Sequence, residues 1–342
     1  MEQKELDDPP LKVGITYNLK KNQKTDDKPV DNDAEYDDIS TILAIKKVLE
    51  SKNCEVTLLE ADQNLPLKLQ DYKPDIVFNI AEGIFGRGRE AQVPALLNFY
   101  KIPYTGSDET TLCVALDKAL SKRVLSSYGI NTPKYRVIFK EQNKLIGRYP
   151  LPAIIKPNAE GSSKGISDFC VANTREELSR LALKNIELYK SDMLVEEYIS
   201  GREFTVGVLG SGEDIKVFLP MEICFINQSQ YNIYSYNVKQ NYKEYVKYEC
   251  PAKISKETEA EMIKTAKKIY KALNCKDFAR IDFRLSQDGR LYFIEINPLP
   301  GLAPGYSDFP MLAQFNGMGY DTLIWNILKS ALKRYGIKYK RG

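Results

Sequence analysis

The stretch Phe278-Ala279-Arg280-Ile281-Asp282-Phe283-Arg284-Leu285 alternates apolar side chains with charged ones. This period of two predicts a strand with one face on the core and a charged face, carrying Arg280 and Asp282, on the other side. The next residues, Ser286-Gln287-Asp288-Gly289, have the composition of a turn. We therefore expect the chain to reverse here and to form a hairpin with the strand that follows.

The second strand of this hairpin is predicted at Leu291-Tyr292-Phe293-Ile294-Glu295-Ile296-Asn297. Strict alternation places three side chains on its core face, which are Tyr292, Ile294 and Ile296. Glu295 and Asn297 then lie on the opposite face. If the two strands pair with their apolar faces on one side, Asp282, Glu295 and Asn297 converge on the other.

Three oxygen-bearing side chains on a rigid sheet face suit Mg²⁺ and the phosphates it carries, because Mg²⁺ takes carboxylate, water and phosphate oxygens. The plain alternative is an amphipathic hairpin whose charges face water, and for any single Asp or Glu that alternative is the commoner one. Asn297, however, directly precedes Pro298-Leu299-Pro300-Gly301, a stiff loop that would fix the geometry of whatever it abuts. The hairpin therefore predicts a magnesium site.

Composition places the chain among soluble globular proteins. Its 342 residues are enough for two or three domains, and 43% of them are hydrophobic and 28% charged. The net charge of +3 gives no electrostatic reason to expect nucleic acid or an anionic membrane as a partner. No apolar run is long enough to span a bilayer. We expect small-molecule partners, no nucleic acid and no membrane.

The cysteines and the missing histidines narrow the chemistry. Six cysteines lie far apart without zinc-ligand spacing and no signal peptide precedes them, so we expect buried thiols in a cytoplasmic protein. Histidine is absent, which excludes Ser-His and Cys-His nucleophiles and His-ligated zinc. Chemistry must rest on Lys, Arg, carboxylates, backbone amides and metal. That set favours phosphoryl transfer, where positioning and charge neutralisation do most of the catalysis.

Patterns along the rest of the chain predict alternating strands and helices. Up to about Ser107 they predict a parallel sheet covered by helices. The spacing of Leu112, Leu116 and Leu120 then predicts one helix that continues to Tyr128. The organisation is therefore α/β.

Two loops stand out. Glu160-Gly161-Ser162-Ser163-Lys164-Gly165 can close over a triphosphate with its backbone N–H groups, although most Gly/Ser loops between strands are plain turns and its spacing is that of neither a P-loop nor a Rossmann motif. Asn227–Glu249 is long, rich in Tyr, Asn and Lys, and without clear periodicity. It is either a functional lid or a sign of a missed element.

Taken in order, a set of motifs resembles the ATP-grasp superfamily and, within it, the D-alanine–D-alanine ligases. The resemblance covers about Val77 to Pro310. The motifs are Ile102-Pro103-Tyr104-Thr105-Gly106-Ser107, Leu116-Asp117-Lys118, Ile155-Lys156-Pro157, Glu160-Gly161-Ser162-Ser163, Gly201-Arg202-Glu203-Phe204-Thr205-Val206, Cys250-Pro251-Ala252, Arg280-Ile281-Asp282 and Glu295-Ile296-Asn297. Each alone could be chance, but in register they match the family strongly.

The resemblance implies an α/β protein with the ATP-grasp fold, in which ATP lies between the central and C-terminal of three α/β domains. The implied domains are an N-terminal domain at 1–108, a central ATP-grasp domain at 109–198, and a C-terminal ATP-grasp domain at 199–342 with its lid at 227–249. The implied ATP contacts are Lys118 and Lys156 for phosphates, Glu196 and Glu203 for adenine and ribose, and Glu160 and Ser163.

The same resemblance implies metal and catalytic residues. Asp282, Glu295 and Asn297 are similar to the family's Mg²⁺ ligands, for two ions with Mn²⁺ as an alternative, and Arg280 is similar to the arginine that neutralises the acyl phosphate. Lys239 and Ser162 are further catalytic matches.

Departures from the family fall in the substrate pocket. Tyr17-Asn18-Leu19-Lys20 replaces a His-Glu pair that helps to anchor the first amino acid, and Gln240 replaces a tyrosine. One extra residue separates Gly301 from Ser307, the candidates for binding the second substrate. Glu82, Arg87, Arg89, Glu90 and Gln92 stand where the family places first-substrate and supporting residues, with a different sequence.

These observations predict an ATP-dependent carboxylate–amine ligase that joins two amino acids through an acyl phosphate and releases ADP and phosphate. One alternative is a ligase of other amino acids in a natural-product or modified cell-wall pathway. Another is a nucleotide-binding regulator without turnover, although it would need neither Arg280 nor the full metal set. A homodimer is an open arrangement, and the sequence leaves the identity and chirality of the substrates undetermined.

Overall fold

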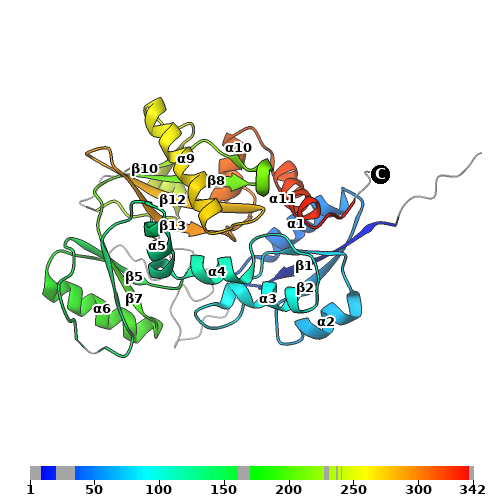
Figure 1. Ribbon diagram of the computed structural model, residues 1–342, viewed down its shortest axis with the longest axis horizontal. Coiled ribbons are helices and arrows are strands. Elements are labelled where there is room, and N and C mark those ends of the chain that lie inside the picture. The colour runs from blue at the N-terminus through cyan, green and yellow to red at the C-terminus, as the bar shows by residue number, and fades with distance from the viewer. Residues whose placement is uncertain are drawn as a thin grey trace, which may run out of the picture.

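The computed structural model describes residues 9–20, 35–142, 144–160, 170–226, 231–235, 238–239 and 241–338, which form three sheets flanked by helices. In Figure 1 the first sheet lies at the lower right, the second forms the lobe at the left, and the third lies above them. Helices α4 and α5 run between the three parts. The α/β class expected from the sequence is confirmed.

The first sheet is parallel, with strand order β2-β1-β3. Its strands are β1 (Leu11–Tyr17), β2 (Cys54–Glu60) and β3 (Ile76–Asn79). Its helices are α1 (Ile39–Glu50), α2 (Leu65–Tyr72), the short 3₁₀ helix η1 (Arg89–Ala91) and α3 (Gln92–Phe99). Strand β1 is a run of mostly buried residues, as expected when helices cover both faces of a parallel sheet. The predicted parallel sheet is confirmed.

The helix predicted through Leu112 to Tyr128 is wrong in one respect, because it is broken at Asp117. The structure has α4 (Glu109–Leu116) followed by α5 (Lys118–Ser127). Asp117 takes an extended conformation and its carboxylate accepts a hydrogen bond from the Leu120 amide at 2.8 Å, which caps α5. The leucine spacing continues across the break, so hydrophobic periodicity alone could not reveal it. The cap puts Lys118 in the first turn of a new helix.

The second sheet is antiparallel, with strand order β4-β7-β5-β6. Its strands are β4 (Tyr135–Ile138), β5 (Ala153–Pro157), β6 (Val171–Ala172) and β7 (Met193–Glu197), and α6 (Arg175–Tyr189) packs on it. The side chains of this sheet and α6 form a hydrophobic core of their own, which includes Ile155, Leu178 and Val195.

The third sheet has the order β11-β10-β8-β12-β13, with β9 paired to β8. Its strands are β8 (Gly201–Leu209), β9 (Lys216–Val217), β10 (Met221–Phe225), β11 (Val246–Glu249), β12 (Phe278–Ser286) and β13 (Leu291–Asn297). Its helices are η2 (Gly212–Asp214), α8 (Tyr242–Tyr245), α9 (Lys256–Ala272), α10 (Asp308–Phe315) and α11 (Tyr320–Arg334). The predicted hairpin is confirmed as the antiparallel pair of β12 and β13.

The side-chain faces predicted for the second hairpin strand are wrong at two positions. The pairing shifts after Asp282, which faces Glu295, so that Phe283 faces Phe293 and Ile294 becomes the extra residue of a β-bulge. Beyond the bulge the alternation is inverted. The core therefore takes Leu291, Phe293 and Ile296, while the predicted core residues Tyr292 and Ile294 lie outside that cluster.

The predicted lid at 227–249 is wrong at its C-terminal end. There the chain forms α8 and then β11, which pairs antiparallel with β10 from Glu222 to Phe225. Strand pairing of this kind fixes residues 246–249 in the sheet. Within the remaining 227–245, residues 227–230, 236–237 and 240 lie outside the described residues, so the earlier part of the lid stays a prediction.

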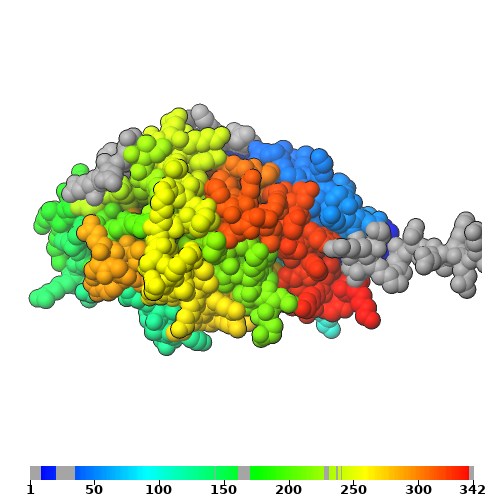
Figure 2. Space-filling model, turned by 90° about the horizontal axis from the view of Figure 1, so that it is seen from above, coloured from blue at the N-terminus to red at the C-terminus, as the bar shows by residue number. Residues whose placement is uncertain are grey.

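The first and third sheets share a hydrophobic core. Helix α11 packs on α1, and Figure 2 shows these segments, in red and blue, side by side. A buried ion pair supports this contact: Arg334 binds Asp277 at 2.7 Å and also donates to the Tyr104 carbonyl at 2.8 Å. Asp277 in turn accepts a hydrogen bond from the Gly106 amide at 2.9 Å. Residues from both ends of the chain therefore form one packed unit.

The cysteines are only partly as predicted. All six are free thiols, as expected. Cys54, Cys170 and Cys275 are buried, but Cys224 and Cys250 are half-buried and Cys113 is exposed. Cys113 follows the buried Leu112 on α4 and so falls on the outward face of that helix.

Candidate active site

A cavity lies between the second and third sheets. Its charged lining includes Lys156, Glu196, Glu203, Arg280, Asp282 and Glu295. Apolar side chains complete the wall, among them Ile154, Ile199 and Ile294. Ile294 is the bulge residue, so the shift in strand pairing adds an apolar surface next to Glu295. A cavity with one apolar part and several charges suits a ligand that has a flat ring and phosphates.

Asp282, Glu295 and Asn297, the predicted metal ligands, lie together on β12 and β13. Asp282 faces Glu295 and Arg280 faces Asn297 in the strand pairing. Arg280 donates to Asp282 through Nε at 3.1 Å and Nη2 at 2.9 Å, a two-point contact that fixes both side chains. The Asn297 side-chain oxygen accepts a hydrogen bond from the Leu299 amide at 2.9 Å, which holds the Pro-rich loop against the end of β13.

Glu295 is an ionised carboxylate in a strongly positive environment. Burial alone would raise the pKa of Glu295, but the charges of Lys118, Lys156 and Arg280 outweigh it and hold the pKa at about 2. Lys118 Nζ lies 3.4 Å from Glu295 Oε2. An ionised carboxylate next to a second one provides the hard oxygen donors that Mg²⁺ prefers.

Lys118 and Glu160, both predicted to bind ATP, are in contact. The Lys118 ammonium donates to the Glu160 carbonyl. The Lys118 amide donates to the Asn158 carbonyl at 3.0 Å, so the start of α5 is held to the segment that follows β5. Ser162 and Ser163, predicted in the same loop, lie outside the described residues.

Glu196 and Lys156 form part of a buried network that also contains Lys122, a residue the sequence reasoning missed. Glu196 lies 2.7 Å from Lys122 Nζ and 2.6 Å from Lys156 Nζ. Burial would raise the pKa of Glu196, but the two lysines outweigh it and lower the pKa. Burial lowers the pKa of Lys122 to about 8 despite its acidic partner. The signal in the sequence is the spacing of Lys118 and Lys122, which puts both on one face of α5.

Glu203, predicted to hold the ribose, lies in the same cavity. Its carboxylate is 3.4 Å from Arg284, which also donates to the carbonyls of Ile199 at 3.0 Å and Asn232 at 2.7 Å. Burial raises the pKa of Glu203 to about 7, against the opposing charge of Arg284. In either protonation state the carboxyl group keeps an oxygen that can accept a hydrogen bond from a ligand hydroxyl.

Lys239 lines the same cavity, close to a buried acid that the sequence reasoning did not identify. Burial lowers the pKa of Lys239, although the nearby Asp308 opposes this shift. Asp308 is 3% exposed, lies 3.4 Å from Arg280, and accepts hydrogen bonds from the hydroxyls of Tyr234 and Tyr248 at 3.3 Å. Only its position directly after Ser307 could have drawn attention to it.

Gly301 and Ser307, predicted to bind the second substrate, face each other across the loop between β13 and α10. A Cβ atom on Gly301 would come within 2.9 Å of Ser307 Oγ. Ser307 Oγ also accepts a hydrogen bond from the Ala303 amide at 3.1 Å. The loop therefore closes on itself, and a side chain at position 301 would disrupt it.

Glu82, the predicted first-substrate residue, follows β3 and lies next to Arg89 and Glu90 of η1. Gly83 has a φ of +79°, and a Cβ there would meet the Arg89 carbonyl oxygen at 2.0 Å. Only glycine fits such a close approach. Arg89 forms an ion pair with Glu35, which precedes α1. Glu35 was not identified as a candidate site residue from the sequence. Among the departures noted above, Asn18 accepts a hydrogen bond from the Gly83 amide at 2.9 Å, and Gln240 lies outside the described residues.

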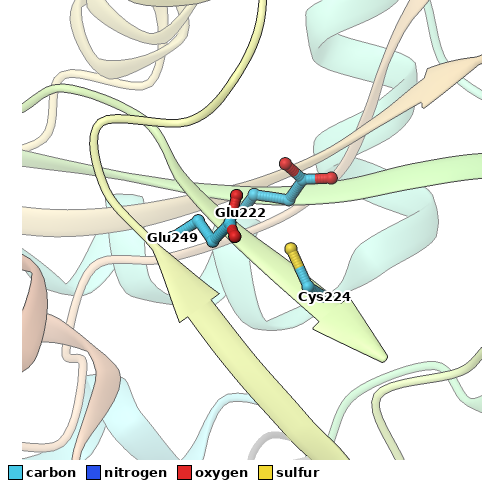
Figure 3. A group of neighbouring side chains, drawn as sticks. All are labelled: Glu222, Cys224 and Glu249. Atoms are coloured by element: carbon cyan, nitrogen blue, oxygen red, sulfur yellow. The ribbon is translucent and has the colours of Figure 1, made fainter. Parts of the chain in front are cut away.

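A second group of metal-type side chains, Glu222, Cys224 and Glu249, lies at the outer edge of the third sheet (Figure 3). Cations already neutralise its carboxylates: Arg202 binds Glu222 with two hydrogen bonds, and Glu249 lies 3.2 Å from Lys247 and 3.1 Å from Lys253. Burial, and then the two glutamates, raise the pKa of Cys224 to about 11, so the thiol is protonated at neutral pH. The group is a charge-paired sheet edge.

Comparisons with known proteins agree on one family. The family model described as D-ala D-ala ligase C-terminus matches residues 124–329. A D-alanine–D-alanine ligase of Aquifex aeolicus is 36% identical over 84% of this chain and 92% of its own length. An uncharacterized protein, y4sG, of Sinorhizobium fredii is 30% identical over 85% and 87%. The solved structure of D-alanine–D-alanine ligase from Bacillus anthracis complexed with ATP has a TM-score of 0.74 at 22% identity, covering 95% of this chain and 99% of that one.

Proposed function

The chain belongs to the D-alanine–D-alanine ligase family and has its ATP-grasp fold, and on that premise we propose that it is an ATP-dependent carboxylate–amine ligase that joins two amino acids. The observation that carries the proposal is the convergence of Lys156, Arg280, Asp282 and Glu295 on one cavity. Such a set can hold a triphosphate, neutralise its charge and bind the metal ion that accompanies it.

In this proposal ATP lies in the cavity between the second and third sheets. Glu203 accepts from the ribose, and Lys118 and Lys156 bind phosphate oxygens. Glu196 accepts from the adenine amine, for which it has to exchange one of its lysine partners. Lys156 is suited to that exchange, because a phosphate can replace the carboxylate that it binds in the described structure.

Asp282, Glu295 and Asn297 fit a divalent cation, because they are neighbouring oxygen donors and Glu295 stays ionised. We propose that they hold Mg²⁺, as two ions, with Mn²⁺ as an alternative. When bound, the metal neutralises phosphate charge and so favours attack by an anionic oxygen.

The proposed reaction has two steps. First, a carboxylate oxygen of one amino acid bonds to the γ-phosphorus of ATP as the bond to ADP breaks. The amine of a second amino acid then bonds to the acyl carbon, phosphate leaves with the carbon–oxygen bonding pair, and the nitrogen loses a proton. Arg280 stabilises the oxygen that becomes negative at the acyl carbon. No step needs an imidazole, in keeping with a chain that has none.

The contact between Arg280 and Asp308 supports this assignment. A guanidinium held by Asp282 on one side and Asp308 on the other is fixed in direction before substrate arrives. We propose that Ser307 and the backbone at Gly301, next to Asp308, bind the carboxylate of the second amino acid.

A screen of amino acids in both chiralities, singly and in pairs, tests the function. ADP release is measured with Mg²⁺ present, and mass spectrometry identifies the product. We expect one pair to give an amide together with ADP and phosphate in equal amounts. Tight ATP binding without ADP release for any amino acid would instead favour a nucleotide-binding regulator.

A further inference from the structure

A cluster of acidic side chains lies next to the proposed phosphate-transfer centre. Three separate segments contribute: Glu35 from the residues before α1, Glu82 from the turn after β3, and Glu90 from η1. Glu160, which follows β5, approaches from the second sheet and lies 3.3 Å from Arg89. The cluster therefore forms where the first and second sheets meet.

The cluster is built around Arg89. Its guanidinium makes a two-point contact with Glu35, which includes Nε to Oε2 at 3.2 Å and Nη2 to Oε2 at 2.6 Å, and donates to the Ala159 carbonyl at 2.9 Å. The Gly83 backbone packs against the Arg89 carbonyl, and Tyr36 donates to the Gly83 carbonyl at 3.3 Å. These contacts fix the segments that carry the acids.

Two carboxyl groups of the cluster have no direct partner among the described residues. Arg89 is shared between Glu35 and Glu160. Glu90 is only 6% exposed, and no described residue donates a hydrogen bond to its carboxyl group or forms an ion pair with it. The same is true of the Glu82 carboxyl within the described part of the chain. The carboxyl groups of Glu82 and Glu90 can therefore each accept a hydrogen bond from a ligand at this site.

The electrostatics agree with the geometry. Burial, and then the charge of Glu35, raise the pKa of Glu90 to about 8. Burial, and then the charge of Glu90, raise the pKa of Glu82 well above its usual value. The charged groups that act on this pair are Glu35, Asp37, Arg89, Lys118 and Glu160. A poorly solvated carboxyl pair with no cation in direct contact, among the described residues, costs folding free energy unless it takes up protons, so a cationic ligand would relieve this cost.

Lys118 connects this cluster to the reaction centre. Its ammonium lies 3.4 Å from Glu295 and donates to the Glu160 carbonyl, and its charge acts on Glu90. A carboxylate placed for phosphoryl transfer near Lys118 and Glu295 would therefore leave the rest of its molecule close to Glu82 and Glu90. That molecule is the first substrate of the proposed reaction.

We propose that the first substrate is a diamino acid, whose two ammonium groups are bound by Glu82 and Glu90 while its carboxylate faces the phosphates. The inference rests on the proposed ligase function. It assigns to the acidic cluster the selection of a doubly cationic amino acid over a neutral one of the same length. Glu35 and Arg89 then act as positioning residues, since their mutual contact holds the segments that carry the two acids.

The test compares charged and neutral amino acids of matched length. Diaminobutyrate, ornithine and lysine are each measured against 2-aminobutyrate, norvaline and norleucine, in both chiralities, by ADP release at a saturating concentration of the acceptor found in the screen. We expect kcat/KM to favour one diamino acid over its neutral counterpart by at least about tenfold, since the two differ by one ammonium group and a charge-assisted hydrogen bond contributes about tenfold or more.

Two amide variants locate the selectivity. Glu90→Gln and Glu82→Gln each keep the side-chain shape, and each should raise KM for the diamino acid about tenfold or more. The neutral amino acid keeps its α-ammonium, so KM for it should rise in the variant whose glutamate binds that group and change about twofold at most in the other. Glu213→Gln, on the exposed η2, is the matched control and should change neither. Because Glu90 has its pKa near 8, KM for the diamino acid should fall between pH 6.5 and 8.5 as the carboxylate forms.

The possible failures are distinguishable. Efficient ADP release with a neutral amino acid, and none of this preference for diamino acids, would overturn the inference and leave the ligase function intact. If no amino acid supports ADP release, calorimetry of diamino acid binding to the full chain with ADP still decides. Proton release upon binding, lost in Glu90→Gln, would support the cluster as a diamino acid site, whereas absence of binding would overturn it.

Discussion

Asp282 faces Glu295 across the β12–β13 pair at the last position before the pairing shifts by one residue. The two carboxylates therefore stay side by side while the next residue along, Ile294, leaves the core and lines the cavity. Because of the shift, the consecutive β13 residues Ile294 and Glu295 both line the cavity, one with an apolar side chain and the other with a carboxylate beside that of Asp282.

Replacing either carboxylate by its amide should abolish the chemistry and preserve the fold. Asp282→Asn and Glu295→Gln each remove one negative charge from the proposed Mg²⁺ site, and we expect amide formation to fall by at least about 100-fold. ADP release at saturating Mg²⁺ measures activity, and circular dichroism measures folding. Asp288→Asn, at the exposed turn of the same hairpin, is the control. Near-normal turnover in either site variant would contradict the metal assignment.

Arg280→Lys keeps the charge but should still be severely impaired. Lysine cannot make the two-point contact by which Arg280 binds Asp282, so its ammonium is not held in a fixed direction. We expect kcat to fall by about 10- to 100-fold with little change in KM for ATP. Arg290→Lys, on the same hairpin and exposed, should be unaffected. A kcat within about twofold of the wild type would show that only the charge matters.

Lys239→Ala tests the proposed lid. We expect amide formation to fall and ATP hydrolysis without amide product to rise, because a lid that no longer closes lets water reach the acyl phosphate. The ratio of ADP to amide measures this loss of coupling, and Lys243→Ala on α8 is the matched surface control. Hydrogen exchange adds a second readout: residues 227–245 should gain protection with an ATP analogue and substrate. Equal protection with and without ligands would mean that the segment is fixed.

Lys122→Met should alter how stability depends on pH. Burial lowers the pKa of Lys122 to about 8 in the folded chain, below the value of about 10.4 of an unfolded lysine. The unfolded chain then binds more protons between these values, so Lys122 makes the free energy of unfolding rise by about 3 kcal/mol across that window. The variant should lack this rise, and urea denaturation from pH 7.5 to 10.5 measures it. Lys264→Met on exposed α9 should keep it.

D-alanine should be a poor first substrate. The first-substrate region departs from the family at Tyr17-Asn18-Leu19-Lys20 and at Gln240, whereas the nucleotide-binding residues match it. In the ADP-release screen, D-alanine paired with itself should therefore give a lower kcat/KM than another pair. If D-alanine with itself is the best pair, the departures are compensated elsewhere and the expectation is wrong.

Alternation and family motifs were sufficient to predict the hairpin, the parallel first sheet and the ATP-grasp fold. These patterns gave wrong predictions where a bulge or a helix cap interrupts the regular spacing of apolar residues. An apolar residue such as Ile294 can face either the core or a cavity, so the alternation of apolar and polar residues could not reveal the bulge. At Asp117 the leucine spacing runs on through the capped break, so only the capping side chain itself could have indicated it.

The site was predictable where its residues are close in sequence or carry a motif. Asp282 and Glu295 come from one hairpin and could be found by alternation. Glu35 and Arg89 are 54 residues apart, and neither alone differs from a surface charge. Asp308 is recognisable as a site residue only from its contacts with Tyr234 and Tyr248, which come from other parts of the chain.

The ion pair of Asp277 with Arg334 helps to divide the molecule into two parts. Together with the core shared by α1 and α11, it joins the first and third sheets, while the second sheet has a hydrophobic core of its own. We therefore expect the second sheet to move as a unit relative to the first and third sheets when the cavity opens. The chain enters and leaves the second sheet near Asn131 and Ser200, and we expect these two connections to absorb the change in backbone angles.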